Sequence, residues 1–222
     1  MNFQVTTAEL FDFSHTVAGD FLKKCRFPWQ ALSHIGAWII AIGERLPSRE
    51  FERVGETVWV ARSGRIAPTA LLMGPCIIGE ETEVRHGAFV RGHTLVGAGC
   101  VVGNSTELKN AILLDGVQVP HFNYVGDSIL GFRAHLGAGA VTSNVKGDKS
   151  PVTVCCGHER IETGRIKLGA MIGDGAEIGC GCVLNPGTVI GRGSRVYPLV
   201  SVRGTVPPEC ICKDSGLFVE KC

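Results

Sequence analysis

Residues 60–108 determine the fold of this chain, and they read VARSGRIAPTALLMGPCIIGEETEVRHGAFVRGHTLVGAGCVVGNSTEL. Every sixth position from Val60 to Leu108 holds a branched aliphatic residue, without a miss. A small residue follows four positions after each of them, as in Gly64, Ala70, Cys76 and Thr82. One large apolar and one small residue per hexad are typical of short strands that stack coil upon coil. The stretch therefore predicts a parallel β-helix of hexapeptide repeats.

A second run keeps the same period and comprises Ile166, Ile172, Ile178, Leu184, Ile190, Val196 and Val202. Between the runs the inward positions continue best as Leu113, Val119, Val125, Leu130, Leu136 and Thr142, where two steps are five residues long. We expect these short steps to act as bulges do and to re-aim nearby side chains. Cysteines at the small positions of the hexads are expected in the core, namely Cys76, Cys100 and Cys182.

Three segments are expected around this repeat. Residues 1–55 lack the period, and we expect a small helical N-terminal cap there, with Thr6 or Thr7 as an N-cap and Pro28 opening an apolar helical stretch. The β-helix is expected over residues 56–208, and residues 209–222 as a C-terminal tail.

A loop insertion interrupts the β-helix at residues 143–165, where the period disappears. Residues 152–154 and 160–163 are rich in β-formers and can pair as a hairpin. Long departures from a repeat usually form loops that carry function. We therefore expect a protruding loop with a role at the site.

Composition excludes several classes of protein. The 222 residues carry a formal net charge of +1, which leaves no basic surplus for binding nucleic acid. The apolar stretch 35–42 is too short to span a bilayer, and the N-terminus lacks the features of a secretory signal. We expect a cytoplasmic protein whose ten cysteines are thiols, with no metal site because the Cys-x-Cys spacings are too tight for a zinc knuckle.

One histidine stands out where the hexad slips, in the segment Pro120-His121-Phe122-Asn123-Tyr124-Val125-Gly126-Asp127. An imidazole can accept a proton near neutral pH. A Glu107 carboxylate nearby would hold the imidazole in one tautomer, and Lys109 and Arg85 could bind an anionic group. The same residues are equally compatible with a solvated surface, so composition alone leaves the function open.

The segments Glu107-Leu-Lys109, His121-Phe-Asn-Tyr124-Val-Gly-Asp127, Leu136-Gly-Ala138-Gly-Ala and Asn144 carry a family resemblance. They resemble the acetyltransferase domain of the bifunctional glucosamine-1-phosphate acetyltransferase/N-acetylglucosamine-1-phosphate uridylyltransferase, a hexapeptide-repeat acyltransferase, over roughly residues 60–205. The resemblance implies an all-β, single-stranded left-handed parallel β-helix that forms a homotrimer and takes part in amino-sugar metabolism and UDP-N-acetylglucosamine biosynthesis.

The resemblance also implies roles for particular residues. His121 would be the general base, with Glu107 near it. Arg85, Lys109, Tyr124 and Asn144 would bind an amino-sugar phosphate. Ala138, Lys149 and Cys180 would contact the co-substrate acetyl-CoA, with the Ala138 N–H donating to the oxyanion.

The chain departs from the family in three places. His135 replaces the usual Asn before Leu136, and residues 1–55 are too few to form a uridylyltransferase. The loop at 143–165 is longer, which leaves the acceptor open between an amino-sugar phosphate and a sugar nucleotide. We expect no uridylyltransferase activity in this chain, and a separate nucleotidyltransferase as a candidate partner.

Two alternatives remain. A non-catalytic β-helix that assembles complexes or senses sugar nucleotides needs only the hexads. A carbonic anhydrase of the β-helix type would hold zinc with a His-x4-His pair, and this sequence contains no such pair among His86, His93, His121 and His135.

Overall fold

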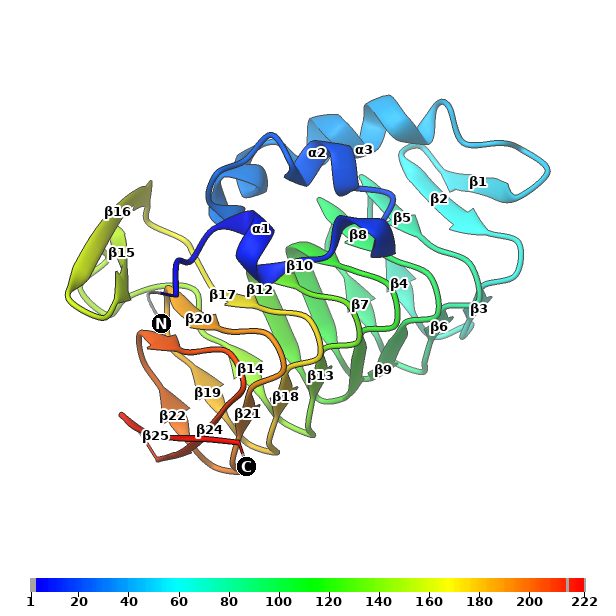
Figure 1. The fold of residues 1–222 in the computed structure, drawn as a ribbon. Coiled ribbons are helices and arrows are strands. Elements are labelled where there is room, and N and C mark those ends of the chain that lie inside the picture. Colours follow the sequence, from blue (N-terminus) through cyan, green and yellow to red (C-terminus); the bar gives the residue numbers. More distant parts are fainter. Residues whose placement is uncertain (1–2, 215, 222) are drawn as a thin grey trace.

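The structure is a computed structural model that describes residues 3–214 and 216–221. It is a solenoid of short parallel strands whose coils stack from β2 to β24 (Figure 1). The predicted fold class, a left-handed parallel β-helix, is confirmed. Each full coil contributes a strand to three faces, named here face 1, face 2 and face 3 in the order in which the chain passes through them.

Face 1 consists of β2 (Val58–Ala61), β5 (Cys76–Ile78), β8 (Thr94–Val96), the second halves of β10 and β12, β17 (Ala170–Ile172), β20 (Thr188–Ile190) and β23 (Thr205–Val206). Face 2 consists of β3 (Arg65–Ile66), β6 (Glu83–Val84), β9 (Val101–Asn104), β11 (Gln118–His121), β13 (His135–Leu136), β18 (Glu177–Ile178), β21 (Arg195–Val196) and β24 (Cys210–Asp214). Face 3 consists of β4 (Leu71–Leu72), β7 (Phe89–Val90), the first halves of β10 (Glu107–Leu113) and β12 (Tyr124–Leu130), β14 (Val141–Thr142), β19 (Val183–Leu184) and β22 (Ser201–Val202).

The solenoid core is built from the predicted inward positions. Fully buried members include Ile78, Val90 and Leu108 of the first run, and all six residues of the interrupted stretch. Cys76, Cys100 and Cys182 are buried as predicted. Ile166 is the exception, because its side chain is 54% exposed beyond the end of the hairpin, and its predicted inward place was wrong.

The short steps make coils of 17 residues in place of 18, since Val96 pairs with Leu113 and Leu113 pairs with Leu130. In these coils β10 and β12 each turn a corner without breaking. Asn110 and Asp127 occupy that corner with φ values of 49° and 48°, in the left-handed region that Asn and Asp tolerate. The short steps therefore fall at this corner and not at His121, and the re-aiming of side chains that we expected from them stays a prediction.

The helical part of the N-terminal segment lies along face 1, and its final strand pairs antiparallel with β2 at the first coil (Figure 1). It comprises α1 (Thr7–Leu10), η1 (Phe13–His15), α2 (Gly19–Leu22), η2 (Pro28–Ser33), α3 (Ile35–Gly43) and β1 (Phe51–Gly55). Thr6 is the N-cap of α1, since its hydroxyl accepts a hydrogen bond from the Glu9 N–H.

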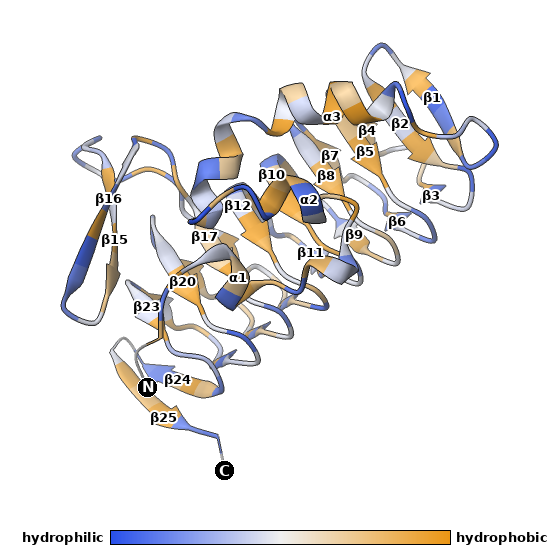
Figure 2. Cartoon of the chain, turned by 45° about the horizontal axis from the view of Figure 1, so that its top comes forward, coloured by the Kyte–Doolittle hydropathy of each residue, from blue (hydrophilic) through white to orange (hydrophobic). Residues whose placement is uncertain are grey.

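Outward apolar side chains on face 1 explain this placement. They form a ladder through Trp59, Ile77, Leu95, Ile112, Ile129, Met171 and Val189, all of them buried. Leu32, Ile35 and Ile39 pack in the same cluster. Burial of such a ladder stabilises the fold by the hydrophobic effect, so the helical segment covers a side where we expected a cap. Figure 2 shows hydrophobic colour on both α3 and the strands beneath it.

The loop at 143–165 contains the predicted hairpin. β15 (Val152–Cys156) pairs antiparallel with β16 (Glu159–Arg165), and Val152 and Val154 pack over the last coils of face 1. The hairpin projects from the edge between faces 3 and 1 (Figure 1).

Residues 210–214 and 217–220 form strands, where the sequence predicted a C-terminal tail. β24 pairs in parallel with β21 and continues face 2, and β25 (Leu217–Glu220) folds back antiparallel along β24. This antiparallel strand covers the last coil, because a bare edge strand would expose unpaired backbone groups. Within residues 3–214 and 216–221, the helices are all too short or too polar to cross a membrane.

Candidate functional site

His121 lies on the edge where face 2 meets face 3, here called the His121 edge. Backbone hydrogen bonds stack its coils: Phe122 N–H donates to Asn104, Gly139 N–H to His121, and Gly181 N–H to Ala138. The structure thus places three predicted site residues, His121, Ala138 and Cys180, one above another in successive coils. His121 and Cys180 are exposed on this edge, and Ala138 is half-buried.

The buried side chain of Asn123 fixes this edge. Its Oδ1 accepts from the His121 N–H at 3.1 Å, and its Nδ2 donates to the carbonyls of Gly137 and Ala140 at 2.8 and 3.0 Å. These bonds tie the His121 turn to the turn that contains Ala138. In the part of the chain that the structure describes, the Ala138 N–H donates no hydrogen bond, which leaves a backbone donor in the coil next to that of His121.

A polar cluster crosses face 3, from Glu107 and Tyr124 at the start of the strands to Asp127 at the edge with face 1. Glu107 and Tyr124 are cross-strand neighbours, and Asn144 donates from Nδ2 to the Tyr124 hydroxyl at 3.3 Å. The same amide donates to Asp127 Oδ2 at 2.6 Å, and Lys109 Nζ lies 3.6 Å from that oxygen. The structure therefore brings together Lys109, Tyr124 and Asn144, which the sequence predicted as substrate-binding residues.

The electrostatics of this cluster favour a protonated phenol. Burial, followed by the nearby charges of Asp127 and Glu107, raises the pKa of Tyr124, although the Asn144 hydrogen bond opposes the shift. Tyr124 is therefore a neutral hydrogen-bond donor at physiological pH.

Among the described residues, the predicted contact of Glu107 with His121 is absent, and Arg85 and Lys149 lie away from the polar cluster. The Glu107 carboxylate is bonded to Arg91 at 2.8 Å, and neither a hydrogen bond nor an ion pair reaches the His121 imidazole. Arg85 lies on face 2, where its guanidinium donates twice to Glu83 at 2.9 and 3.1 Å. Lys149 is exposed in a turn of the insertion.

The sequence analysis missed Arg91 and Asp127. The Arg91 N–H donates to the Leu108 carbonyl, so Arg91 lies one coil before Lys109 at the same place on face 3. Its bond to Glu107 raises the pKa of Arg91. The 18-residue spacing from Lys109 was the signal, because one regular coil of three hexads returns to the same place.

His135, the departure from the family pattern, lies on face 2. Its Nδ1 is 2.9 Å from Glu177 Oε2 in the next coil. An open groove of about 620 Å³ runs beside this pair and is lined by Gln118, Phe132 and Arg133. The pair is a cross-strand contact on a face other than that of the polar cluster.

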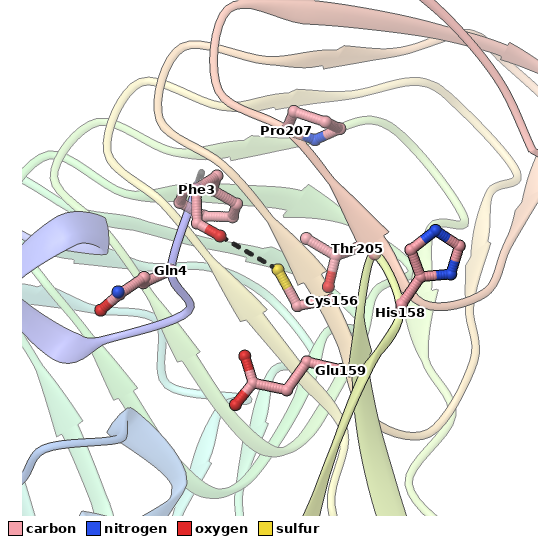
Figure 3. Close-up of a pocket in the computed structure, with 8 residues that line it drawn as sticks. Phe3, Gln4, Cys156, His158, Glu159, Thr205 and Pro207 are labelled. Carbon is pink, nitrogen blue, oxygen red and sulfur yellow. Dashed lines mark hydrogen bonds between the residues drawn. The ribbon is translucent and has the colours of Figure 1, made fainter. Parts of the chain in front are cut away.

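A separate hollow of about 430 Å³ lies between the N-terminal residues, the hairpin tip and β23 (Figure 3). Cys156 lines it and donates from Sγ to the Phe3 carbonyl at 3.2 Å, with Glu159 and Thr205 nearby. Burial raises the pKa of the Cys156 thiol, and Glu159 raises it further. A protonated thiol is a poor nucleophile, so this environment disfavours nucleophilic chemistry at Cys156.

Metal-ligating side chains do not gather in the described structure: no group of three or more His, Cys, Asp or Glu residues there could hold a metal ion. The nine described cysteines are free thiols.

This chain is similar to one family model and to several known proteins. Residues 72–163 match the family model described as the GMPPB C-terminal domain. The chain is 33% identical over 153 residues to a bifunctional sugar-1-phosphate nucleotidylyltransferase/acetyltransferase of Sulfurisphaera tokodaii, covering 61% of this chain and 38% of that protein. It is 32% identical over 109 residues to the bifunctional protein GlmU of Methanococcus maripaludis, covering 49% of this chain and 26% of that protein.

The solved acetyltransferase domain of PglB from Neisseria gonorrhoeae, in complex with acetyl coenzyme A, superposes with a TM-score of 0.36. It is 19% identical and covers 70% of this chain and 53% of that chain.

Fold and site together define a hexapeptide-repeat β-helix protein. The resemblance to the bifunctional nucleotidylyltransferase/acetyltransferases, expected from the segments around His121, is confirmed. The chain spans between about a quarter and two fifths of the length of these two relatives.

Proposed function

We propose that this chain is an acetyl-CoA-dependent N-acetyltransferase that acts on an amino-sugar phosphate resembling glucosamine 1-phosphate, or on a related sugar nucleotide. One observation carries the proposal: Lys109, Tyr124 and Asn144 come from three different parts of the sequence and meet on face 3. Among the described residues, the His121 imidazole and the Ala138 N–H make no hydrogen bond, and both belong to the edge at which face 3 begins. The bifunctional relatives whose names include an acetyltransferase support the same reading.

The acceptor would bind through face 3. Lys109 and Arg91 supply two cations one coil apart, and a phosphate group is the anion that such a pair recognises. The Tyr124 hydroxyl and the Asn144 Oδ1 would meet sugar hydroxyls, while the Asn144 Nδ2 stays bonded to Tyr124 and Asp127. Arg91 replaces Arg85 in this proposal, because Arg85 lies on face 2 and is held by Glu83.

The transfer needs a base and a hydrogen-bond donor that stabilises the oxyanion. An amine attacks the thioester carbonyl carbon through its lone pair, so it must be unprotonated, and His121 takes the proton as the C–N bond forms. The Ala138 N–H donates to the carbonyl oxygen while it carries negative charge. The C–S bond then breaks, and the proton passes from the imidazole to the departing thiolate of coenzyme A. A positioned base contributes roughly 10²- to 10⁴-fold in rate.

In this scheme Glu107 acts on residues of the acceptor site. Its carboxylate is held by Arg91 and raises the pKa of Tyr124, so it tunes the two groups that would meet the sugar phosphate. Acetyl-CoA would lie along the His121 edge, past Ala138 and toward Cys180, with Lys149 of the insertion reaching its phosphates. We propose no metal for this step.

The partners we propose are two further copies of this chain. Phe122 and Leu199 are 61% and 83% exposed on the same edge as His121, and exposed apolar side chains of this size favour an interface. A homotrimer would bury them beside the site. A separate nucleotidyltransferase, a cytoplasmic location and the lack of nucleic-acid and membrane partners stay predictions.

Mass spectrometry tests the proposed function directly. The purified chain would be incubated with acetyl-CoA and a panel of amino-sugar phosphates and amino-sugar nucleotides, and the gain of one acetyl group would be recorded. We expect one member to be acetylated, and His121→Ala to lose at least about 100-fold in rate. His158→Ala, an exposed imidazole on the hairpin, is the matched control and should retain native activity.

Two outcomes contradict the proposal. If none of the amino sugars gains an acetyl group, the chain is better described as a non-catalytic assembly or sensing module. If His121→Ala is as active as His158→Ala, a different group removes the proton. Zinc analysis of the same preparation tests the carbonic anhydrase alternative.

A further inference from the structure

Asp127 is a buried carboxylate at the edge between faces 3 and 1. The residue is 3% exposed, and both of its carboxylate oxygens are engaged. Asn110 donates to Oδ1 at 2.8 Å from the preceding coil, and Asn144 donates to Oδ2 at 2.6 Å from the insertion. A buried charge is costly unless it is paired and hydrogen-bonded, so this environment is built around the carboxylate.

Two basic side chains, Lys109 and Arg165, lie within reach of the Asp127 charge. Lys109 Nζ lies 3.6 Å from Oδ2, and its side chain is 26% exposed. The carboxylate also acts on Arg165, at the end of β16, since its charge opposes the lowering of the Arg165 pKa by burial. Asp127 is therefore paired with one basic group of the solenoid, Lys109, and its charge also reaches Arg165 at the end of the insertion.

The backbone of Asp127 holds the root of the insertion. Its carbonyl accepts from the Gly169 N–H, where the chain returns to the solenoid, and the Asn144 carbonyl accepts from the Leu168 N–H. The side chain fixes Asn144, where the chain leaves. One residue thus ties both ends of the inserted hairpin to the corner of a single coil.

We propose that Asp127 is a positioning residue of the acceptor site, an inference that rests on the function proposed above. Its carboxylate holds the Asn144 amide and the Lys109 ammonium in the orientation that binds the acceptor. Asp127 itself does not contact the acceptor, because its side chain is covered and both oxygens are occupied. Its effect is expected on acceptor binding and not on acetyl-CoA, which would lie along the His121 edge.

The test compares Asp127→Asn with a double variant, Asn110→Asp/Asp127→Asn. The side-chain amides of Asn110 and Asn144 both donate to Asp127, and an amide at position 127 has only one oxygen to accept them. Asp127→Asn therefore leaves one of the two donors unpaired and lowers Tm. The double variant exchanges the two side chains, and both corner positions tolerate either residue. It restores both hydrogen bonds but moves the charge away from Asn144.

We expect both variants to raise the KM for the amino-sugar phosphate about tenfold, the factor associated with losing one hydrogen bond to a charged group. The KM for acetyl-CoA should stay native, and the Tm of the double variant should return toward the native value. The inference is overturned if the double variant recovers the acceptor KM together with Tm, because Asp127 would then be structural. It is also overturned if both KM values rise equally.

A second readout does not depend on activity. The chain has two tyrosines, so ultraviolet titration in a Tyr197→Phe background reports on Tyr124 alone. Removing the Asp127 charge should shift the Tyr124 titration to lower pH, because that charge is one of the causes that raise the pKa of this phenol. If the native chain acetylates no amino sugar, the proposed function fails. An unchanged tyrosine titration in Asp127→Asn overturns the present inference separately.

Discussion

The Arg91 guanidinium donates a 2.8 Å hydrogen bond to the Glu107 carboxylate, and this contact joins two successive coils of face 3. Both side chains remain partly exposed, at 44% and 33%, so an incoming anion can reach the cation. The pair orients Arg91 toward the cluster that contains Tyr124 and Asn144.

Arg91→Ala should therefore raise the KM for an amino-sugar phosphate by about tenfold or more, the loss expected for a charge-assisted contact. Arg85→Ala provides the comparison, because that residue has the same charge but lies on face 2. We expect its KM to stay within about twofold of native. Steady-state kinetics with varied acceptor distinguish the two, and a larger effect of Arg85→Ala would mean that the acceptor binds across face 2.

The sequence predicted the solenoid well because one physical requirement repeats in every hexad. An inward position must be apolar to fill the core, and Val90, Val102 and Leu108 meet it at a fixed spacing. The insertion broke that spacing, and Ile166 was assigned inward although the chain had not yet returned to the solenoid.

The place of the helical segment was not predicted, although face 1 carries the signal. Its strands are apolar at the outward position as well, as in Ile77, Leu95 and Ile112, and only a covered face would keep such residues. The period of the inward positions does not show this second, outward row of apolar side chains.

The site was predicted in part for a related reason. His121, Ala138 and Cys180 fall at one edge because short coils and the insertion together preserve the register. The partner of Glu107 depends on side-chain direction between coils, which spacing in the sequence does not report, so Arg91 was missed.

The contact between the N-terminal segment and face 1 predicts a large stability effect at Ile129. The side chain is fully buried in the cluster between the solenoid and the helices. Ile129→Ala should lower the free energy of unfolding by about 2–5 kcal/mol, through lost burial and the cavity left behind. Urea denaturation measures this change.

Val54→Ala is the control for that experiment, since Val54 is 55% exposed on β1. It should change the free energy of unfolding by no more than about 0.5 kcal/mol. Equal effects of the two substitutions would mean that the helical segment does not pack on face 1 in solution.

The buried thiol of Cys76 predicts a pH dependence of stability. Burial disfavours the thiolate and raises the pKa of Cys76 to about 12. In the unfolded chain the thiol ionises near its ordinary value of about 8.5. The stability contributed by the protonated thiol is therefore complete below about pH 8.5 and is lost as the pH rises toward 12.

Cys76→Ala removes this dependence along with some packing. We expect the difference in unfolding free energy between the native chain and Cys76→Ala to shrink by up to about 1.4 kcal/mol per pH unit above pH 9. Urea denaturation in the presence of a reductant at several pH values measures it. A constant difference for Cys76→Ala over these pH values would contradict the buried assignment.

The exposed apolar residues on the His121 edge predict the assembly state. Phe122 and Leu199 would lie between copies in the proposed trimer, so sedimentation velocity should give about three times the 23.6 kDa chain mass. Leu199→Asp and Phe122→Asp place a charge in a surface that must lose water, which is costly without a partner. We expect both variants to sediment as single chains, with the acetyl transfer activity reduced because the edge beside His121 loses its neighbouring copy.

Val17→Asp serves as the matched variant, because Val17 is 52% exposed on the N-terminal segment, away from the His121 edge. It should keep the native sedimentation coefficient. A native chain that sediments at 23.6 kDa, or a Leu199→Asp variant that remains trimeric, would show that copies do not meet along this edge. In that case the exposed phenylalanine and leucine would have to be covered by a different partner, and the position of acetyl-CoA between chains would have to be abandoned.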